Sequence, residues 1–284
     1  MEPKFVEEFQ KLNQKYDRIA DKKYSYSVSG LRSLGTNLQN PFMRIGLFTT
    51  LLSRKYAKTM GIMITASHNA ACDNGVKVIA TDGGMLGDQD SVMCQEFVNS
   101  DTPLDFLRDT FGSDVAAQDY EGDVWIGNDT RDTSLMLKEC LCAGASLLKA
   151  NIKDFGVVTT PQLHWLVQQN FNGEDDISLD HYWNRYVDAF TTLNTLTAEN
   201  EKYWKDRQIF VDGADGVGGY QVSGAKNKFT GLLDFELVND SLSENAVVNE
   251  DCGAEHVQKG QTIPKNFDDA KFYEKKCASF DGDA

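Results

Sequence analysis

Asp123-Val-Trp-Ile-Gly127 decides the fold class of this 284-residue chain. The run is short and apolar, as a buried strand is, and it leads into the polar loop Asn128-Asp-Thr-Arg131 and a helical segment over 133–150. The same order returns at once, because Phe155-Gly-Val-Val158 predicts a strand and Thr160-Pro161 begins a helix that reaches about residue 169. Repeated strand–loop–helix units indicate an α/β protein with mixed, mostly parallel sheets flanked by helices.

The N-terminal part predicts two helices before its first strand. Apolar residues recur at helical spacing between Phe5 and Ile19. A second helix is expected over 40–56, with Asn40 as its N-cap and Pro41 at its first position. Gly61-Ile-Met-Ile-Thr65 then predicts a strand that runs into the polar loop Ala66-Ser-His-Asn69.

The C-terminal part follows a polar, turn-rich segment at 171–176, which is the best linker candidate. Ser178 is expected to cap a long helix with an aromatic and apolar face. The length corresponds to about two average domains, and we expect them at 1–176 and 177–284. Short apolar runs predict three further strands, at 208–211, 233–238 and 277–280.

The charge balance restricts the partners. A net charge of −15, from 28 basic and 43 acidic residues, repels nucleic-acid backbones and anionic lipid, so we expect neither as a partner. An anionic small substrate would need local Arg, Lys or metal charge. No run approaches the roughly 20 apolar residues of a membrane span, and Met1-Glu-Pro-Lys4 does not begin a signal peptide. The six cysteines are therefore expected to be reduced thiols of a cytoplasmic protein.

Ser67 and the pair Asp281 and Asp283 are the first candidates for chemistry. A serine in a loop after a strand can be a nucleophile when something activates it, although in isolation it is more often a turn or capping residue. Two carboxylates at i and i+2 around Gly282 can both face a hard cation such as Mg²⁺, although a lone Asp-x-Asp is more often an acidic turn. The residues alone leave both alternatives open.

Glycine-rich and basic segments are candidates for a phosphate site. The loop Gly213-Ala-Asp-Gly-Val-Gly-Gly219 has neither the Rossmann spacing nor the Lys-Ser/Thr of a P-loop, so it is a tight strand-to-helix turn and a weak phosphate signal. Arg32, Lys77 and Arg131 lie in segments that we expect to be loops. Each alone is typical of a surface charge, but together they are the local positive charge that an anionic substrate needs.

These motifs, in this order, resemble those of the α-D-phosphohexomutase superfamily. The resemblance covers essentially the whole chain. Two strings, Thr159-Thr-Pro-Gln-Leu-His164 and Cys277-Ala-Ser-Phe-Asp-Gly-Asp-Ala284, favour its acetylglucosamine branch over the glucose or mannose mutases. The other segments that carry the resemblance are Met63-Ile-Thr-Ala-Ser-His-Asn69, Asp73-Asn-Gly-Val-Lys77, Gly127-Asn-Asp-Thr-Arg131, Val211-Asp-Gly-Ala-Asp-Gly-Val-Gly218 and Asp251-Cys-Gly-Ala254.

The resemblance implies a site and a reaction. It implies domain I of a phosphohexomutase over 1–176 and an incomplete domain II over 177–284, ending at the metal loop. Ser67 would be the phosphoserine, and Ser67, Asp281 and Asp283 would hold Mg²⁺. The phosphoserine would exchange its phosphoryl group with a sugar phosphate, converting N-acetylglucosamine 6-phosphate to the 1-phosphate through a 1,6-bisphosphate, on the route to UDP-N-acetylglucosamine. Further implied residues are His68, Lys77 and Arg32 for catalysis, and Asn69 and Arg131 for substrate phosphate.

The departures from the family pattern matter as well. Ala70 stands where the family has proline, and Asn128 where it has an arginine. The family's third metal-binding aspartate and its two later domains have no counterpart in these 284 residues. We therefore expect negligible mutase activity from the chain alone, and poor solubility or self-association from an exposed sheet edge.

Two alternatives stay beside the mutase interpretation. The first is a non-catalytic remnant that binds a partner or a sugar phosphate without turnover. The second is a phosphatase with Asp281 as nucleophile, which is disfavoured because its Asp-x-Asp motif normally lies near the beginning of the domain. The general base and the oligomeric state are left open.

Overall fold

Contacts divide the chain into two compact units. The computed structural model describes residues 2–112, 120–196, 207–240, 246–268 and 270–284. The first unit comprises residues 1–66, 72–157 and 163–174, and the second comprises 67–71, 158–162 and 175–284. The short segments 67–71 and 158–162 thus group with the second unit, although they interrupt the first in the sequence.

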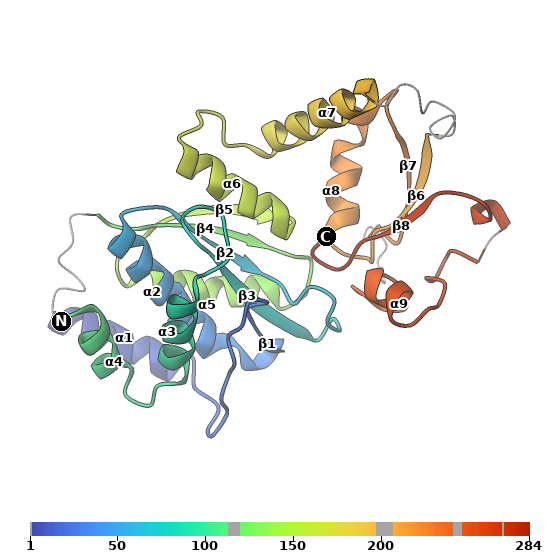
Figure 1. Ribbon diagram of the computed structural model, residues 1–284. Helices are drawn as coiled ribbons and strands as arrows, with labels where there is room; N and C mark the ends of the chain where they lie inside the picture. Colours follow the sequence, from blue (N-terminus) through green and yellow to red (C-terminus); the bar gives the residue numbers. More distant parts are fainter. Residues whose placement is uncertain (1, 113–119, 197–206, 241–245, 269) are drawn as a thin grey trace. The chain divides into compact units, whose positions relative to one another are not determined.

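The first unit is built on a five-stranded mixed sheet in the order β1-β3-β2-β4-β5 (Figure 1). The pairs β2–β4 and β4–β5 are parallel, while β3 runs antiparallel to both β1 and β2. In chain order the elements are α1 (Pro3–Lys15), β1 (Leu31–Leu34), η1 (Gly35–Asn37), α2 (Gln39–Tyr56), β2 (Met60–Ile64), β3 (Asp73–Ile79), α3 (Asp88–Asn99), α4 (Pro103–Phe111), β4 (Asp123–Asn128), α5 (Ser134–Ser146), β5 (Asn151–Val157) and α6 (Thr160–Asn172), whose first residues belong to the segment 158–162.

Helices cover both faces of the central strands. All five residues of β2 are buried, and alternate residues face opposite sides of the sheet. One face carries α2 and α5, which pack closely because a Cβ at Gly46 or at Gly144 would overlap a backbone carbonyl of the facing helix. On the other face, Gly61 lies against Val167 of α6. The strand–loop–helix order of the sequence is therefore confirmed as an α/β fold.

The second unit is built on a parallel sheet in the order β7-β6-β8. As predicted, Ser178 caps α7, because its Oγ accepts the backbone N–H of His181 at 3.1 Å. Phe210, Phe267 and Phe272 form a small buried cluster beside the sheet. The elements in chain order are α7 (Leu179–Leu196), β6 (Gln208–Asp212), α8 (Val217–Ala225), η3 (Lys226–Phe229), β7 (Asp234–Val238), α9 (Ala254–Gln258), η4 (Ala270–Phe272) and β8 (Cys277–Ser279).

Two local expectations are wrong. Arg32 and Lys77 do not lie in loops, because β1 pairs with β3 in a register that sets Arg32 opposite Gly75 and draws both segments into the sheet. Asn40 does not cap α2, and Pro41 is not its first residue, because the helix begins at Gln39. The side-chain amide of Asn40 instead donates to the carbonyl oxygen of Tyr16 at 2.7 Å, so a distant contact replaces the cap.

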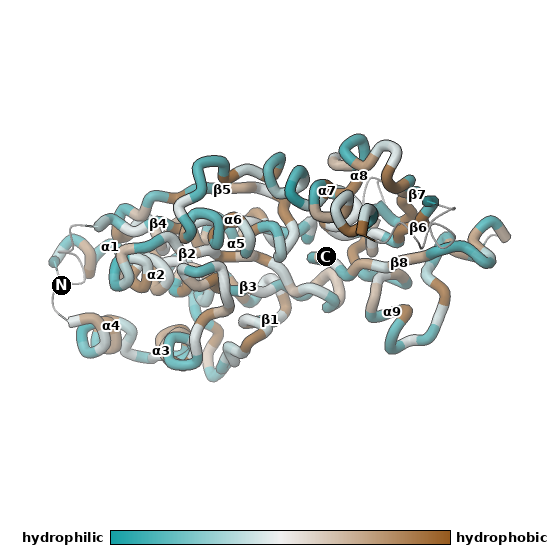
Figure 2. The backbone as a smooth tube through the Cα atoms, turned by 45° about the horizontal axis from the view of Figure 1, so that its top comes forward, coloured by the Kyte–Doolittle hydropathy of each residue, from teal (hydrophilic) through white to brown (hydrophobic). Residues whose placement is uncertain are grey.

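The helix α4 is amphipathic. Figure 2 shows hydrophilic and apolar positions alternating along α4, which is typical of a helix with one face on a core. Within the described ranges, no helix combines the length and the apolarity needed to cross a bilayer.

Candidate functional site

Ser67 lies in the short loop that follows β2, in the segment that groups with the second unit. Its φ is +55°, in the left-handed region that serine rarely occupies, and only 7% of the residue is exposed. Its Oγ donates a hydrogen bond of 2.6 Å to Oδ2 of Asp281, which is 214 positions away in the sequence. The fold thus brings the predicted phosphoserine onto the predicted metal loop.

The acidic loop Asp281-Gly-Asp283 follows β8 at the carboxyl end of a parallel sheet. Loops from neighbouring parallel strands meet at that edge, which is where open α/β sheets usually bind ligands. Gly282 is required there, because a Cβ would lie 2.5 Å from the carbonyl oxygen of Ser67. A Cβ at Gly216 would lie 2.7 Å from the carbonyl oxygen of Gly282, so the glycine-rich loop lets the acidic loop approach.

Thr160 holds the second aspartate of this loop. Its hydroxyl donates to Oδ2 of Asp283 at 2.5 Å, and its backbone N–H donates to the Asp283 carbonyl at 3.1 Å. Asp283 is almost completely buried. Side chain and backbone are therefore fixed together, which restricts the directions in which the carboxylate can point.

Asp212, at the end of β6, is a buried structural hub. Its Oδ1 accepts the N–H of Ala214 and the side-chain amide of Asn239, at 3.0 and 2.9 Å. Its Oδ2 accepts the N–H of Gly253 at 2.8 Å and the hydroxyl of Ser279 at 2.5 Å. Because both carboxylate oxygens are used, Asp212 ties four segments of the second unit together.

His68 meets an acidic partner next to Ser67. Its Nε2 lies 3.4 Å from Oε2 of Glu255 on α9, and both side chains are partly exposed. Lys259 contacts the other carboxylate oxygen of Glu255 at 2.6 Å. This arrangement orients the imidazole while leaving part of it open to solvent.

Arg131 lies in the loop between β4 and α5, as expected, but its guanidinium is buried. Its Nε donates to Oδ2 of Asp129 at 2.9 Å with both side chains inaccessible to solvent, and a second nitrogen donates to the carbonyl oxygen of Asp73 at 3.1 Å. Burial raises the pKa of Asp129, while the Arg131 guanidinium and the Ser134 hydroxyl oppose that shift. The phosphate-binding role of Arg131 stays a prediction.

The other predicted residues are distributed over both units. Arg32 is on β1 and Lys77 on β3 of the first unit, whereas Asn69 belongs to the Ser67 loop. The roles that we predicted for these three residues likewise stay predictions.

The oxygen atoms around Ser67 are of the chemical type that Mg²⁺ binds. Hydroxyl and carboxylate oxygens are hard ligands, and Mg²⁺ is commonly held by one or two carboxylates while water and phosphate oxygens fill its other positions. Ser67 and Asp281 are already in contact, and Asp283 is two residues further along the same loop. Among the residues that the structure describes, no three His, Cys, Asp or Glu side chains gather as a metal cluster, so a site here would depend on the serine or its phosphate.

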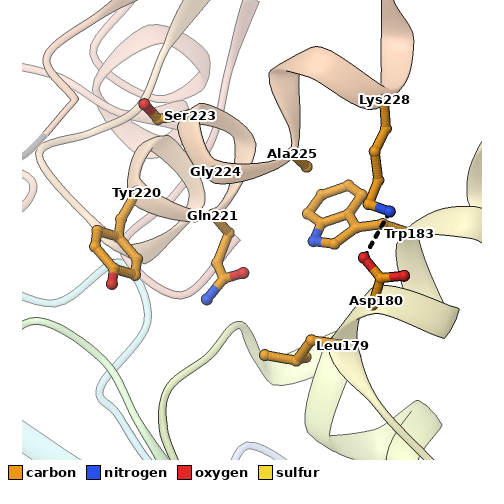
Figure 3. A pocket seen from close by; sticks show the side chains of 9 residues that line it. All are labelled: Leu179, Asp180, Trp183, Tyr220, Gln221, Ser223, Gly224, Ala225 and Lys228. Atoms are coloured by element: carbon orange, nitrogen blue, oxygen red, sulfur yellow. Dashed lines mark ion pairs between the residues drawn. The ribbon is translucent and has the colours of Figure 1, made fainter.

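A hollow of the second unit lies between α7 and α8 and has a volume of about 490 Å³ (Figure 3). Trp183 and Tyr220 contribute aromatic rings to it. Lys228 faces Asp180 at one side, where the ammonium and carboxylate groups lie 2.6 Å apart. Ser67, Asp281 and Asp283 do not line this hollow, so it is separate from the predicted site.

The sequence interpretation missed three residues that surround the serine and acidic loops. Thr160 and Glu255 were not assigned a role, although both lie in or beside segments that carried the resemblance. Asn249 was missed completely; its side-chain amide donates to the carbonyl oxygens of Ser67 and Asn69 at 2.8 and 3.0 Å. An asparagine two residues before Asp251-Cys-Gly-Ala254 was the only local signal.

Two family models match the chain. Residues 40–105 and 106–180 match phosphoglucomutase/phosphomannomutase, alpha/beta/alpha domain I, and residues 175–284 match phosphoacetylglucosamine mutase AMG1, domain II. The phosphoacetylglucosamine mutase of Oryza sativa subsp. japonica is 34% identical over 277 residues, which cover 92% of this chain and 47% of that protein. The chain therefore spans about half the length of the curated relatives it matches.

Solved structures agree in fold. An N-acetylglucosamine-phosphate mutase of the α-D-phosphohexomutase superfamily, in its substrate complex, matches with a TM-score of 0.87 and 26% identity, over 99% of this chain and 53% of that one. The Aspergillus fumigatus N-acetylphosphoglucosamine mutase in complex with GlcNAc-6P and magnesium matches with a TM-score of 0.84 and 27% identity, over 100% and 53%. A serine-to-alanine variant of that fungal enzyme, in complex with glucose 1,6-bisphosphate, also matches, with a TM-score of 0.86 and 26% identity, over 100% of this chain and 53% of that one.

Proposed function

Because the chain belongs to the phosphoacetylglucosamine mutase family of the α-D-phosphohexomutase superfamily, we propose that it carries the phosphoserine and metal loops of an enzyme that interconverts N-acetylglucosamine 6-phosphate and 1-phosphate. One observation supports this function above the others. The hydroxyl of Ser67 donates a hydrogen bond to Asp281, so the predicted nucleophile and the predicted metal ligand are already in contact. We further propose domain I over 1–176 and domain II over 177–284. In support, the match to the domain I family model ends at residue 180 and the match to the domain II model begins at residue 175.

The reaction begins with Ser67 in its phosphorylated form. The phosphoryl group passes from Oγ to a free hydroxyl of the sugar phosphate: the Ser67 O–P bond breaks and the sugar O–P bond forms. The sugar hydroxyl loses its proton, and Oγ of Ser67 takes one up to become a hydroxyl again. The resulting 1,6-bisphosphate turns over and returns its other phosphoryl group to Ser67. In the unphosphorylated serine, Asp281 accepts the hydrogen bond of Oγ and so orients this oxygen to take back the phosphoryl group, while Thr160 fixes the carboxylate of Asp283.

Charge explains why a cation is expected in this chemistry. A phosphoserine adds about −1.5 to −2 charges at neutral pH, here beside the carboxylate of Asp281. Mg²⁺ held by Ser67, Asp281 and Asp283 would offset this charge and withdraw electrons from the phosphoryl group being transferred. We propose His68, Lys77 and Arg32 as groups that stabilise the transferring oxygens or assist proton movement, and Asn69 and Arg131 as phosphate ligands.

The half-reaction tests this function. The chain and its Ser67→Ala variant are incubated with glucose 1,6-bisphosphate and Mg²⁺, and the phosphate is located by peptide mass spectrometry. The proposal requires phosphate on Ser67 in the chain and none in the variant or after removal of Mg²⁺ with EDTA. Phosphate on another residue, or no phosphate despite binding of the sugar bisphosphate, would instead support a binding protein without turnover.

A further inference from the structure

Asn249 connects the loops that surround Ser67. Its backbone N–H donates to the carbonyl oxygen of Ala214 in the glycine-rich loop at 2.9 Å. Its side-chain amide donates to two carbonyls of the serine loop, those of Ser67 at 2.8 Å and Asn69 at 3.0 Å. A Cβ at Gly282 would lie 2.8 Å from the same amide nitrogen, so the acidic loop packs against it too.

Both Asn249 and Ser67 adopt left-handed backbone conformations, with φ of +61° and +55°. Asparagine tolerates this region, but for serine a sparsely populated conformation costs on the order of 1–3 kcal/mol and persists only when its surroundings fix it. In Ser67 the carbonyl oxygen is held by Asn249 and the hydroxyl by Asp281. The two contacts fix opposite ends of the residue.

We propose that Asn249 is a positioning residue that holds the Ser67 loop in its strained conformation and so aims Oγ toward Asp281. This proposal rests on the proposed function, because it assigns Asn249 a part in phosphoryl transfer at Ser67. A misplacement of about 1 Å at a reacting atom can slow a reaction by about 100-fold, so the effect of losing the amide is large. Asn249 acts through the loop and does not touch the phosphoryl group.

A simpler role for Asn249 would be to form the turn at its own backbone position. Glycine adopts a positive φ without strain, so Asn249→Gly keeps the turn and removes only the amide. Asn249→Asp keeps the size of the side chain but cannot donate to the two carbonyls. Gln261 supplies the matched control, because it is exposed, has a φ of +50° and lies in another loop of the same unit.

The experiment measures single-turnover phosphorylation of Ser67 by glucose 1,6-bisphosphate with Mg²⁺, in the chain and in the variants Asn249→Gly, Asn249→Asp and Gln261→Gly. We expect both Asn249 variants to lower the maximal rate by about 10- to 100-fold with little change in the half-saturating concentration. Gln261→Gly is expected to react at the rate of the unchanged chain. Hydrogen exchange is followed in parallel and is expected to quicken at 67–71 in the Asn249 variants alone.

Each outcome decides the proposal. If Asn249→Gly accepts phosphate as fast as the unchanged chain, Asn249 only forms its own turn and the proposal is wrong. A loss confined to the half-saturating concentration would make Asn249 a substrate-binding residue and would also overturn it. If the unchanged chain accepts no phosphate, the proposed function fails and the transfer role with it. Hydrogen exchange at 67–71 then separately decides whether the amide holds the loop.

Discussion

Replacing Asp212 with asparagine should destabilise the second unit while changing almost nothing in its shape. Asp212 is 1% exposed and accepts four hydrogen bonds, two on each carboxylate oxygen. The asparagine side chain would have the same size, but one oxygen would become an NH₂ group that cannot accept. Whichever way the amide turns, two donors lose their acceptor.

The size of the loss follows from these contacts. A hydrogen bond to a charged group contributes about 1.5–3 kcal/mol, and a buried donor left without a partner costs about 1–3 kcal/mol. If the new NH₂ group faces Gly253 and Ser279, the Ser279 hydroxyl can rotate and accept a hydrogen bond from it. The Gly253 N–H can only donate, so it is left without an acceptor. We therefore expect a decrease of about 2–4 kcal/mol in the free energy of local unfolding, or roughly 30- to 1,000-fold in the opening equilibrium.

Hydrogen exchange measured by mass spectrometry reports this change segment by segment. Peptides that cover β6, β8 and 249–254 should lose protection by that factor, while the sheet of the first unit keeps its own. Asp234→Asn, at an exposed position of β7, removes the same charge and is the control. If the protection factors of Asp212→Asn differ from those of this control by less than about threefold, the free energies of local unfolding differ by less than about 0.7 kcal/mol. That result would refute the role of Asp212 as a structural hub.

Three further predictions concern packing and charge. Gly144→Ala should lower the stability of the first unit by about 1–3 kcal/mol in urea unfolding, because α2 has no room for a Cβ, whereas Gly224→Ala, with open space, should be neutral or stabilising. Arg131→Met should lower the free energy of unfolding by about 3–5 kcal/mol in the same assay, because the buried carboxylate of Asp129 loses its guanidinium partner. Burial raises the pKa of the Cys252 thiol from 9.0 to about 12, and the negative charge of Asp212 adds to this shift. The unfolded thiol then ionises first, so the free energy of unfolding should fall above pH 9, and less so in Cys252→Ala.

Local patterns predicted the central strands and the cap of α7, whereas the cap predicted at Asn40 was wrong. Asp123-Val-Trp-Ile-Gly127 forms most of β4, because a short apolar run is stabilised by burial in the core. Ser178 caps α7 by accepting the backbone N–H of His181, three positions along the chain. The strands that contain Arg32 and Lys77 were missed, because glycine and polar residues weaken the strand signal. The segment around Lys77 joins the sheet by pairing with β2, and the segment around Arg32 joins it by pairing with β3.

In the candidate site, too, residues within motifs were predicted, and residues that act through distant contacts were not. Ser67 and Asp281 were predicted from their motifs, and the structure places them in contact across 214 positions; their roles stay predictions. Asn249 and Thr160 act through hydrogen bonds to residues more than 120 positions away, and no spacing rule reports such a contact. The burial of Arg131 against Asp129 could not be anticipated either, because exposure depends on the complete fold.

The most direct test of the account is the phosphorylation state of Ser67 in protein isolated from its own cells, without added sugar phosphate. The proposed cycle begins with phosphorylated Ser67 and restores it, so the account predicts that the peptide containing Ser67 carries one phosphoryl group on that residue. The phosphate should leave the serine when N-acetylglucosamine 6-phosphate is added. A Ser67 peptide that is always unmodified, in protein whose second unit is folded by hydrogen exchange, would contradict the central claim.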